Sequence, residues 1–481
     1  MMGKVVFPSL QISMWMSAVS KHVIKKMSFD KKKGKMEIDM LHGPLFMKIL
    51  LFALPLAASS LMQQLFNSID VAVVGHFASR EALAAVGSNG PVINLLINLF
   101  LGISMGANVI ISNHIGQNDR QSIRDAINTI ALVSVVSGVL LMIVGQVVAR
   151  PILELIDTPE NVIDLSVVYL RIYFLGIPFF LIFNFAAAIL RSIGDTRRPL
   201  YILVIAGIVN TVFNLVFVIG FDMSVAGVAI ATSISNVISA VLIVRILLRE
   251  SDPYRLVVKE MHIKWEELKR MLQIGVPAGI QGMIFSFSNV LMQSAINGYG
   301  AAAIAGSAAS LNFESYCYFL VVAFNGAAIS FIGQNYGAGD NKRVRRVFWI
   351  CMGLGMAFCL TSNLLISWQH TLCLSAFSTD PEVLAFGSER ILVALATQSI
   401  ACFYEIPGAA LRGMGRSVLP TVITVFGTCL LRIVWIFGVA EHYRSFKVLM
   451  AAYPVSWTLT GIMMSVAFYI FMKKLPVSRN A

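Results

Sequence analysis

The sequence predicts an all-α, polytopic membrane protein in which twelve transmembrane helices form two six-helix lobes arranged as a parallel repeat. Three observations lead to this prediction. The chain of 481 residues is 57% hydrophobic and only 13% charged, with a mean hydropathy of +0.78, which ordinary soluble domains do not approach. It contains twelve long apolar stretches separated by short polar connectors. The motif Leu-Arg-x-x-Gly-x-x-x-x-Pro occurs twice, at 190–199 and at 411–420.

Each apolar stretch is long enough to cross a bilayer, whose core of about 30 Å requires roughly 20 helical residues. A β-barrel is excluded because its strands are alternating segments of about ten residues, whereas ALVSVVSGVLLMIVGQVV (131–148) is apolar on every face. The expected spans, in chain order, are 46–74, 85–112, 127–148, 165–189, 200–220, 224–248, 271–296, 303–331, 347–368, 391–411, 419–439 and 448–472.

The segments outside the spans divide the chain into parts. Residues 1–43 are rich in lysine and lack the apolar region and cleavage site of a signal peptide, so we expect a disordered cytoplasmic leader attracted to anionic headgroups. The first lobe is expected over 44–248 and the second over 271–475. The charged linker 249–270 is either an amphipathic helix on the inner membrane surface or a solvated connector. Residues 476–481 are expected to form a cytoplasmic tail.

The two halves are related by an internal duplication. Six spans per half is an even number, so both halves begin and end at the same membrane face, and the repeat is parallel, as in transporters with a central site. In the repeated motif the glycine ends one helix and the proline begins the next, which predicts a structural hairpin and not a ligand site. Three further pairs recur 222 residues apart: Leu54-Pro55 with Val276-Pro277, Asn67 with Asn289, and Pro159-Glu160 with Pro381-Glu382.

The distribution of lysine and arginine predicts the orientation. With a cytoplasmic N-terminus, 30 of the 37 basic residues lie at the inner face and six, including Arg390, at the outer face, while Arg432 lies within a span. This asymmetry follows the positive-inside rule and places both termini in the cytoplasm. The net charge of +12 is therefore explained by topology, and no nucleic-acid partner is expected.

Enzymatic activity is not expected, because the sequence shows no constellation of nucleophile, base or metal ligands. The six cysteines lie in or beside second-half spans, without a C-x-x-C motif and without histidines at ligand spacing. We interpret them as small buried apolar residues. No cofactor is expected, and H⁺ or Na⁺ would serve only as a coupling ion.

Four segments, in their order along the chain, resemble a known transporter family. They are LPLAASSLMQQLFNSIDVAVVGH (54–76), LRSIGDTRRP, VNTVFN (209–214) and LRGMGRSVLP. The pattern covers residues 44–475 and is similar to the multidrug and toxic compound extrusion (MATE) family, in its bacterial branch of NorM-like and DinF-like members. The resemblance implies a V-shaped pair of lobes, alternating access, and export of large, often cationic organic molecules driven by re-entry of H⁺ or Na⁺. From the same resemblance we expect the protein to be a monomer in the bacterial inner membrane.

Asp70 is the only carboxylate in the apolar part of the first six spans. A charge at membrane depth is costly and is a functional candidate by default. Burial disfavours the charged form of a carboxylate, so Asp70 can hold a proton in one state and release it in another. The resemblance implies that this first-span acid carries the cation coupling and would bind Na⁺ if Na⁺ were the coupling ion.

Asn210 and Asn214 are spaced i, i+4 and therefore share one helix face. Counting helical rise places them, Asp70 and Thr232 in the outer half of the first lobe, and the resemblance implies that the three polar side chains face Asp70. The alternative is plain hydrogen bonding between helices. Some family members carry a second carboxylate where this chain has Asn214, and its absence favours H⁺ over Na⁺.

The second lobe does not repeat this constellation, because the repeat offset maps Asp70 to Met292. It carries Glu405 and Arg432 in consecutive spans instead, and we expect these two charges to form a buried pair with a structural or gating role. The seventh span lacks the acid that NorM-like members carry there.

The leading functional hypothesis is a secondary active antiporter that works by alternating access, with Asp70 as the coupling carboxylate. We expect its export substrates to be small organic molecules that are cationic. The alternative is a flippase for lipid-linked oligosaccharide or lipid II, which shares the duplicated architecture. A channel or receptor is disfavoured because the intramembrane carboxylate is specific to one lobe, which argues against a symmetric pore.

Overall fold

The computed structural model describes residues 37–156 and 158–475, and these residues form helices joined by short loops without any strand. Within this part of the chain, twelve helical segments are long and apolar enough to span a membrane. Each expected span falls on one of them, so the all-α class and the number of spans are confirmed. The leader up to residue 36 and the tail 476–481 lie outside the described residues.

The first six spans are continuous helices. Two of the helices begin at capping side chains: Ser79 accepts a hydrogen bond from the backbone N–H of Ala82 at 3.1 Å, and Asp119 accepts one from that of Ser122 at 3.1 Å. The helices are α2 (Leu45–Phe77), α3 (Arg80–Gln117), α4 (Arg120–Leu155), α5 (Glu160–Ser192), α6 (Arg197–Leu215) with its π-helical extension η1 (Val216–Gly220), and α7 (Ser224–Leu247).

The last six spans are more interrupted. The tenth span covers α12, η3, η4 and α13, the eleventh covers α14, η5, α15, η6 and α16, and the twelfth covers α17 and α18. The elements are η2 (Val258–Glu260), α8 (Trp265–Asn297), α9 (Ala301–Gly337), α10 (Asn341–Trp368), α11 (His370–Ser375), α12 (Pro381–Arg390), η3 (Ile391–Leu395), η4 (Gln398–Ala401), α13 (Cys402–Gly413), α14 (Val418–Thr424), η5 (Val425–Leu430), α15 (Leu431–Val434), η6 (Trp435–Ala440), α16 (Glu441–Tyr443), α17 (Phe446–Met450) and α18 (Ala452–Lys474).

The repeated motif forms a tight turn between two helices in both lobes. The glycine of the motif is Gly194 with φ +96° in the first copy and Gly415 with φ +79° in the second, a left-handed backbone that residues with a Cβ rarely adopt. Pro199 and Pro420 lie in the first turns of α6 and α14. The predicted structural hairpin is therefore present twice. Of the expected linker 249–270, residues 249–264 contain no α-helix, and residues 265–270 form the start of α8.

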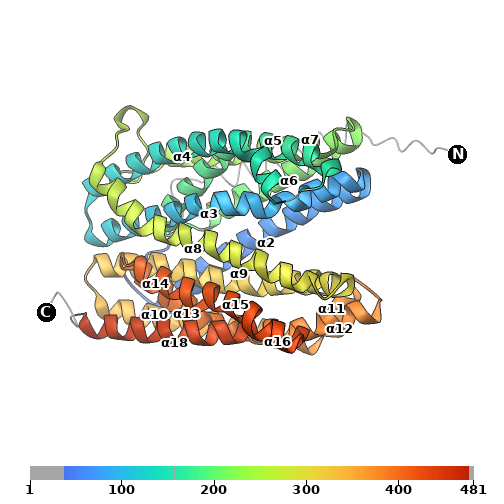
Figure 1. Ribbon diagram of the computed structural model, residues 1–481. Coiled ribbons are helices and arrows are strands. Elements are labelled where there is room, and N and C mark those ends of the chain that lie inside the picture. The colour runs from blue at the N-terminus through green and yellow to red at the C-terminus, as the bar shows by residue number, and fades with distance from the viewer. Residues whose placement is uncertain (1–36, 157, 476–481) are drawn as a thin grey trace. The chain divides into compact units, whose positions relative to one another are not determined.

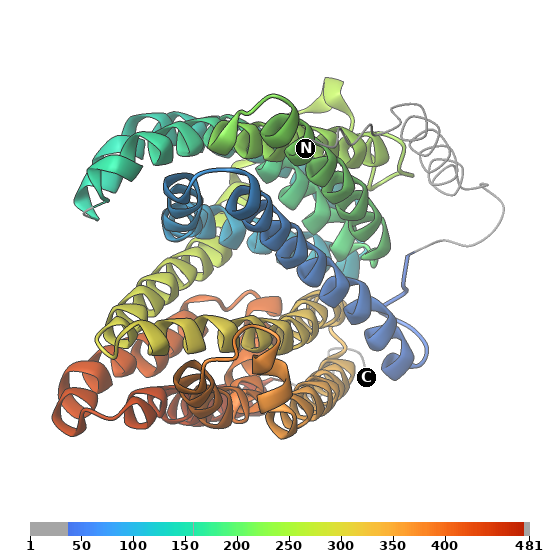
Figure 2. The same ribbon diagram turned by 90° about the vertical axis from the view of Figure 1, so that its right-hand side faces the viewer.

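The two halves form two bundles, with α2 and α8 running obliquely between them (Figures 1 and 2). The lobes meet chiefly where α3 packs against α8 and α9, and where α2 packs against α9. Gly102 and Gly106 of α3 face Gly275 and Gly279 of α8, and a Cβ on Gly102 would lie 2.2 Å from the backbone N of Gly279. Both pairs are spaced G-x-x-x-G, so only glycine permits this close approach of the helices.

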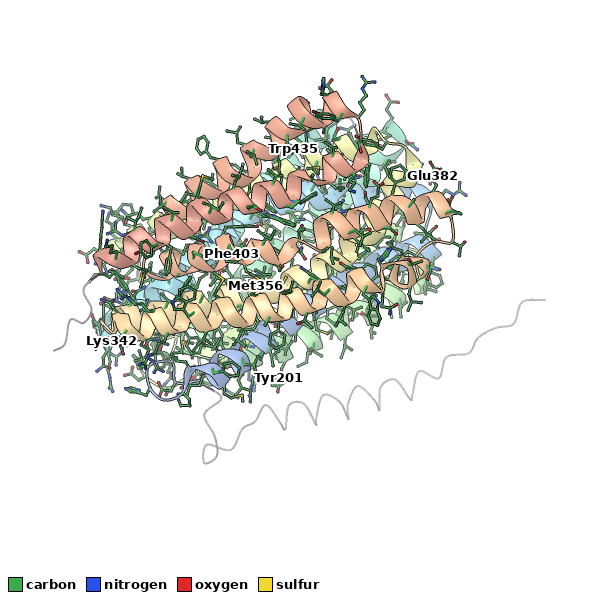
Figure 3. All side chains as sticks on the ribbon, turned by 90° about the horizontal axis from the view of Figure 1, so that it is seen from below. Tyr201, Lys342, Met356, Glu382, Phe403 and Trp435 are labelled. Carbon is green, nitrogen blue, oxygen red and sulfur yellow. The ribbon has the colours of Figure 1, made fainter. Side chains whose placement is uncertain are left out.

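The ends of the bundles are charged and the flanks are apolar (Figure 3). Lys342 lies at the end that carries the interlobe linker, here called the linker end, and Glu382 lies at the opposite end. Tyr201 and Phe403 are each 44% exposed on the flanks. Exposed apolar flanks between charged ends are what a protein that spans a bilayer presents to lipid.

Candidate functional site

The structure brings the four polar residues of the first lobe into contact. Asn214 donates its Nδ2 to Asp70 Oδ1 in a short hydrogen bond, and Thr232 donates its hydroxyl to Asp70 Oδ2 at 3.5 Å. Asn210 Nδ2 donates to the Thr232 hydroxyl at 3.2 Å, and Asn214 Nδ2 also approaches Asn210 Oδ1 at 3.3 Å. One carboxylate from α2 is thus held by neutral groups from α6 and α7.

The position of Asp70 is set by close packing of α2 on α6. Gly207 faces the ring of Phe66, and a Cβ added there would lie 1.8 Å from a ring carbon. Phe66 precedes Asp70 by four residues, and Gly207 precedes Asn210 by three and Asn214 by seven, so the same helix faces continue one and two turns further along. The π-helical turn η1 begins two residues after Asn214, and such turns often occur at functional sites.

Burial leaves this first-lobe site with an unused acceptor. Asp70 is 8% exposed, and Asn214 is fully buried. Asn214 Oδ1 has no hydrogen-bond partner among the described residues, although its Nδ2 has two. A buried unpaired amide oxygen is unfavourable, so it marks a place where a proton donor or a cation would be stabilised.

In the second lobe the expected pair of Glu405 with Arg432 is wrong. Glu405 accepts hydrogen bonds from the Tyr318 hydroxyl and from Asn325 Nδ2, each at 2.7 Å. Arg432 donates instead to Ser456 Oγ at 3.2 Å and to Asn289 Oδ1 at 3.3 Å. The reason is helix orientation, because α13 turns Glu405 toward α9, whereas α15 packs against α8 and α18.

A buried ion pair that we did not predict lies in the same lobe. Arg390 donates from Nε to Glu314 Oε1 at 2.6 Å and from Nη2 to Glu314 Oε2 at 3.0 Å, and both residues are at most 5% exposed. Arg390 was placed at the outer end of its span because the span was begun at 391. The tenth-span helix instead begins at Pro381, where Asp380 accepts a hydrogen bond from the N–H of Glu382 at 2.8 Å. The sequence signal for the pair was Glu314, a carboxylate in the middle of an apolar stretch.

Polar contacts join the lobes from the linker end to the middle of the helices. They pair α3 with α8, α9 and α13, and they pair α9 with the last residue of α5. They are Asn98 with Ser286 at 2.9 Å, Asn108 with Ser330 at 3.1 Å, His114 with Glu267 at 2.9 Å, Asn113 with the carbonyl of Gly413 at 3.1 Å, and Gln334 with the carbonyl of Ser192 at 2.6 Å.

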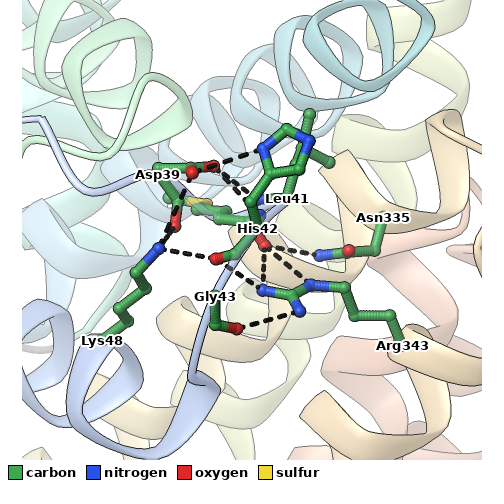
Figure 4. A network of polar contacts seen from close by, with 8 residues as sticks. Asp39, Leu41, His42, Gly43, Lys48, Asn335 and Arg343 are labelled. Carbon is green, nitrogen blue, oxygen red and sulfur yellow. Dashed lines mark hydrogen bonds and ion pairs between the residues drawn. The ribbon is translucent and has the colours of Figure 1, made fainter.

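Residues 38–43 add a further connection between the lobes at the linker end. The backbone N–H of Ile38 donates to the carbonyl of Gly194 in the first lobe at 3.1 Å. The carbonyl of Met40, whose side chain is fully buried, accepts from Asn335 Nδ2 at 3.1 Å and from the guanidinium of Arg343 at 3.2 and 3.3 Å. Figure 4 shows Asn335 and Arg343 beside this segment. The expectation of a disordered leader is therefore wrong for residues 38–43, because both lobes hold this backbone.

Asp39 fixes the turn within this connecting segment. Partial burial acts against the charge of its carboxylate, but the N–H groups of Leu41 and His42 donate to it at 2.9 and 3.1 Å. These bonds and the nearby Lys48 outweigh the burial and hold the pKa of Asp39 below its ordinary value. The turn is therefore held by an ionised carboxylate at neutral pH (Figure 4).

Comparison with known proteins gives the family. The MatE family model matches residues 55–216 and 277–437, once in each half, and the two matches begin 222 residues apart. The chain belongs to the MATE family of transporters. The repeat read from the sequence is thus the repeat of the family, and this MATE chain is a multi-pass membrane transporter and not an enzyme.

Individual relatives are similar over most of their length. The Bacillus subtilis protein YoeA, named as a probable multidrug resistance protein, is 27% identical over 441 residues, which are 89% of this chain and 94% of YoeA. NorM of Thermotoga maritima, named in the same way, is 25% identical over 410 residues, 82% of this chain and 86% of NorM. A solved MATE structure in an outward-facing conformation shares the fold, with a TM-score of 0.85, 18% identity and coverage of 92% and 99%. These matches do not favour the flippase alternative.

Proposed function

We propose that this MATE transporter is a secondary active antiporter that exports small organic molecules by alternating access and is driven by re-entry of H⁺, with Asp70 as the coupling carboxylate. The observation that supports this most directly is the contact of buried Asp70 with an amide that keeps one oxygen unpaired, Asn214 Oδ1. The names of the relatives YoeA and NorM, both multidrug resistance proteins, support export of drug-like compounds.

The Asn214 amide offers Asp70 a partner in both protonation states. The ionised carboxylate accepts a hydrogen bond from Nδ2, which is the arrangement described above. A protonated Asp70 would become a hydrogen-bond donor. Rotation of the Asn214 side-chain amide by 180° would then present its free Oδ1 to Asp70 as the acceptor. Asn210 and Thr232 would follow, because each is bonded to this pair. Proton uptake would therefore change which helix atoms are bonded across α2, α6 and α7.

The same oxygens could ligate Na⁺, which prefers hard oxygen donors like other hard cations. The candidates are the Asp70 carboxylate, the amide oxygens of Asn210 and Asn214, and the Thr232 hydroxyl. Only one of them carries a negative charge, and that charge is already engaged by two donors. We therefore place H⁺ before Na⁺ as the coupling ion.

The remaining parts of the proposal concern orientation and state. The linker end carries most of the basic residues, so we assign it and both termini to the cytoplasmic face of a bacterial inner membrane. The contacts between lobes lie from this end to the middle of the helices, which fits a state closed to the cytoplasm. We propose that one chain is the transporting unit.

The test uses everted membrane vesicles that carry the transporter and a fluorescent drug-like dye. An imposed ΔpH should drive dye uptake, an imposed Na⁺ gradient should not, and Asp70→Asn should abolish uptake at wild-type expression. Glu154→Gln, an exposed carboxylate on α4, is the matched control and should transport normally. Unchanged ΔpH-driven uptake by Asp70→Asn would refute the role of Asp70. Uptake driven by Na⁺ alone would reverse the choice of ion.

A further inference from the structure

The second lobe contains a cavity of about 210 Å³ between α8, α9 and the last three spans. Its rim includes the exposed side chains of Asn289 and Gln293 of α8. Its floor includes three buried charged residues, Glu314, Arg390 and Arg432. The cavity is therefore reachable from its rim and charged at its base.

The charges at the base do not cancel. Arg390 and Glu314 form the bidentate pair described above and neutralise each other. Arg432 is 1% exposed, and its hydrogen-bond partners, Asn289 and Ser456, are neutral. The remaining carboxylate of this region, Glu405, is held by Tyr318 and Asn325 rather than by Arg432. The described part of the cavity thus carries one uncompensated positive charge.

Aromatic rings hold the Arg432 guanidinium but leave it able to bind. Its Cζ lies 4.4 Å from the ring centroid of Tyr453, 5.4 Å from that of Phe285 and 5.8 Å from that of Trp457. Cation–π contacts offset part of the cost of a buried charge. These ring contacts leave the N–H groups of the Arg432 guanidinium available as hydrogen-bond donors. Nε and Nη1 donate to Ser456 and Asn289, while Nη2 has no protein acceptor among the described residues.

A second group in the wall also lacks a partner. Gln398 is 5% exposed, lines the cavity, and donates its Nε2 to the carbonyl of Glu314 at 3.0 Å. Its Oε1 is buried without a hydrogen-bond partner in the described part of the chain. A ligand that carries a hydrogen-bond donor as well as an anionic group would satisfy both Gln398 and Arg432.

The internal duplication allows the charged residues of the two lobes to be compared position by position. The offset of 222 maps Asp70 to Met292, which lies in this cavity, and the offset of 221 between the two hairpin motifs maps Asn210 to Leu431, the residue next to Arg432. The place equivalent to Asp70 is therefore uncharged in the second lobe, and a guanidinium lies beside the place equivalent to Asn210. The π-helical segments η5 and η6 flank α15, the short helix that holds Arg432, and wide turns of this kind often mark functional positions.

We propose that this cavity binds an organic anion or zwitterion, with the Arg432 guanidinium pairing with a carboxylate or phosphate and the rings of Phe285, Tyr453 and Trp457 contacting an aromatic body. A planar guanidinium matches the geometry of both oxyanions. The proposed ligand therefore differs in charge from the cationic export substrates that the sequence analysis expects. Only the claim that the bound molecule is cargo rests on the proposed export function, and the test below measures binding without any ion gradient.

The test compares three ligands that share one ring system: 2-naphthoate, 2-naphthalenemethanol and 2-naphthylmethylamine, with charges of −1, 0 and +1. Binding to the full chain in phosphatidylcholine nanodiscs is measured by calorimetry and by quenching of tryptophan fluorescence, since Trp457 lines the cavity. Naphthoate should bind at least tenfold tighter than the alcohol and the amine. Equal binding of all three, or tightest binding of the amine, would overturn the proposal.

Two substitutions locate the site. Asn289→Asp places a carboxylate where the amide oxygen now lies 3.3 Å from Arg432 Nη1, so it should weaken naphthoate binding at least tenfold and leave the alcohol unchanged. Because residue 289 is exposed, this variant should fold even if Arg432→Met does not. Arg412→Met, a buried arginine outside the cavity that donates to Gln281, is the control and should bind naphthoate normally. Unchanged naphthoate binding by Asn289→Asp would refute the assignment to Arg432.

Two further measurements distinguish a lipid occupant from a soluble one, and the anion site from the coupling site. If a lipid phosphate occupies the cavity, phosphatidylglycerol nanodiscs should weaken naphthoate binding in the wild type but not in Asn289→Asp, which would support the oxyanion site with a lipid as its occupant. If the occupant is soluble, the lipid should have no effect. Asp70→Asn should bind naphthoate like the wild type, so a failed coupling site and a failed anion site give different results.

Discussion

The buried pair of Glu314 and Arg390 allows a quantitative prediction. Both residues are at most 5% exposed, and two charge-assisted hydrogen bonds of 2.6 and 3.0 Å join them. Removing one partner of such a pair strands the other charge and costs about 3–5 kcal/mol, whereas removing both costs much less. Glu314→Gln should fall at the lower end of this range, because the remaining Arg390 still faces the ring of Tyr453 at 5.6 Å.

The free energy of unfolding should therefore fall by about 3–5 kcal/mol in Glu314→Gln and in Arg390→Gln, and the double variant should lose clearly less than the sum of the two. The assay is equilibrium unfolding in mixed micelles, with the fraction of sodium dodecyl sulfate as denaturant and tryptophan fluorescence as readout. Arg150→Gln is the matched control, because it breaks an exposed pair with Glu154, and it should cost less than about 1 kcal/mol. The reasoning would be refuted if the losses of unfolding free energy in the two single variants simply added in the double variant. It would also be refuted if each single loss were no larger than that of Arg150→Gln.

Three further predictions concern packing, closure and topology. Gly207→Ala should lower the free energy of unfolding by about 1–3 kcal/mol because the new Cβ meets the ring of Phe66, and adding Phe66→Leu should recover part of the loss in the same unfolding assay. Arg343→Gln removes the donors to three backbone carbonyls of the leader, so a cysteine at buried Ser192 should react with a thiol reagent several-fold faster, whereas the neighbouring Lys342→Gln should leave that rate unchanged. In a background without native cysteines, single cysteines at Gln121 and Lys342 should react with an impermeant thiol reagent only from the cytoplasm and one at Thr379 only from outside, and labelling of the first two in intact cells would reverse the topology.

The sequence by itself determined the number of spans, the duplication and the Asp70 candidate. Membrane spans can be read from hydropathy because the backbone in lipid must bond within each helix, which requires long apolar runs. Asp70 stands out because a charge in such a run is rare. Depth along a helix follows from counting residues at a fixed rise, so the common level of Asp70, Asn214 and Thr232 was also accessible. The contacts among them agree with that level.

The tertiary structure alone decided which charged side chains meet. Successive residues on a helix are rotated by about 100°, so two charges at one depth can face different neighbours. Glu405 and Arg432 lie in consecutive spans, yet packing turns Glu405 toward α9 and Arg432 toward α8 and α18, while Arg390 reaches Glu314 from α12. Residues 38–43 are ordered for the same reason: their backbone bonds to groups 295 and 303 residues further along the chain, which only the meeting of the two lobes brings into reach.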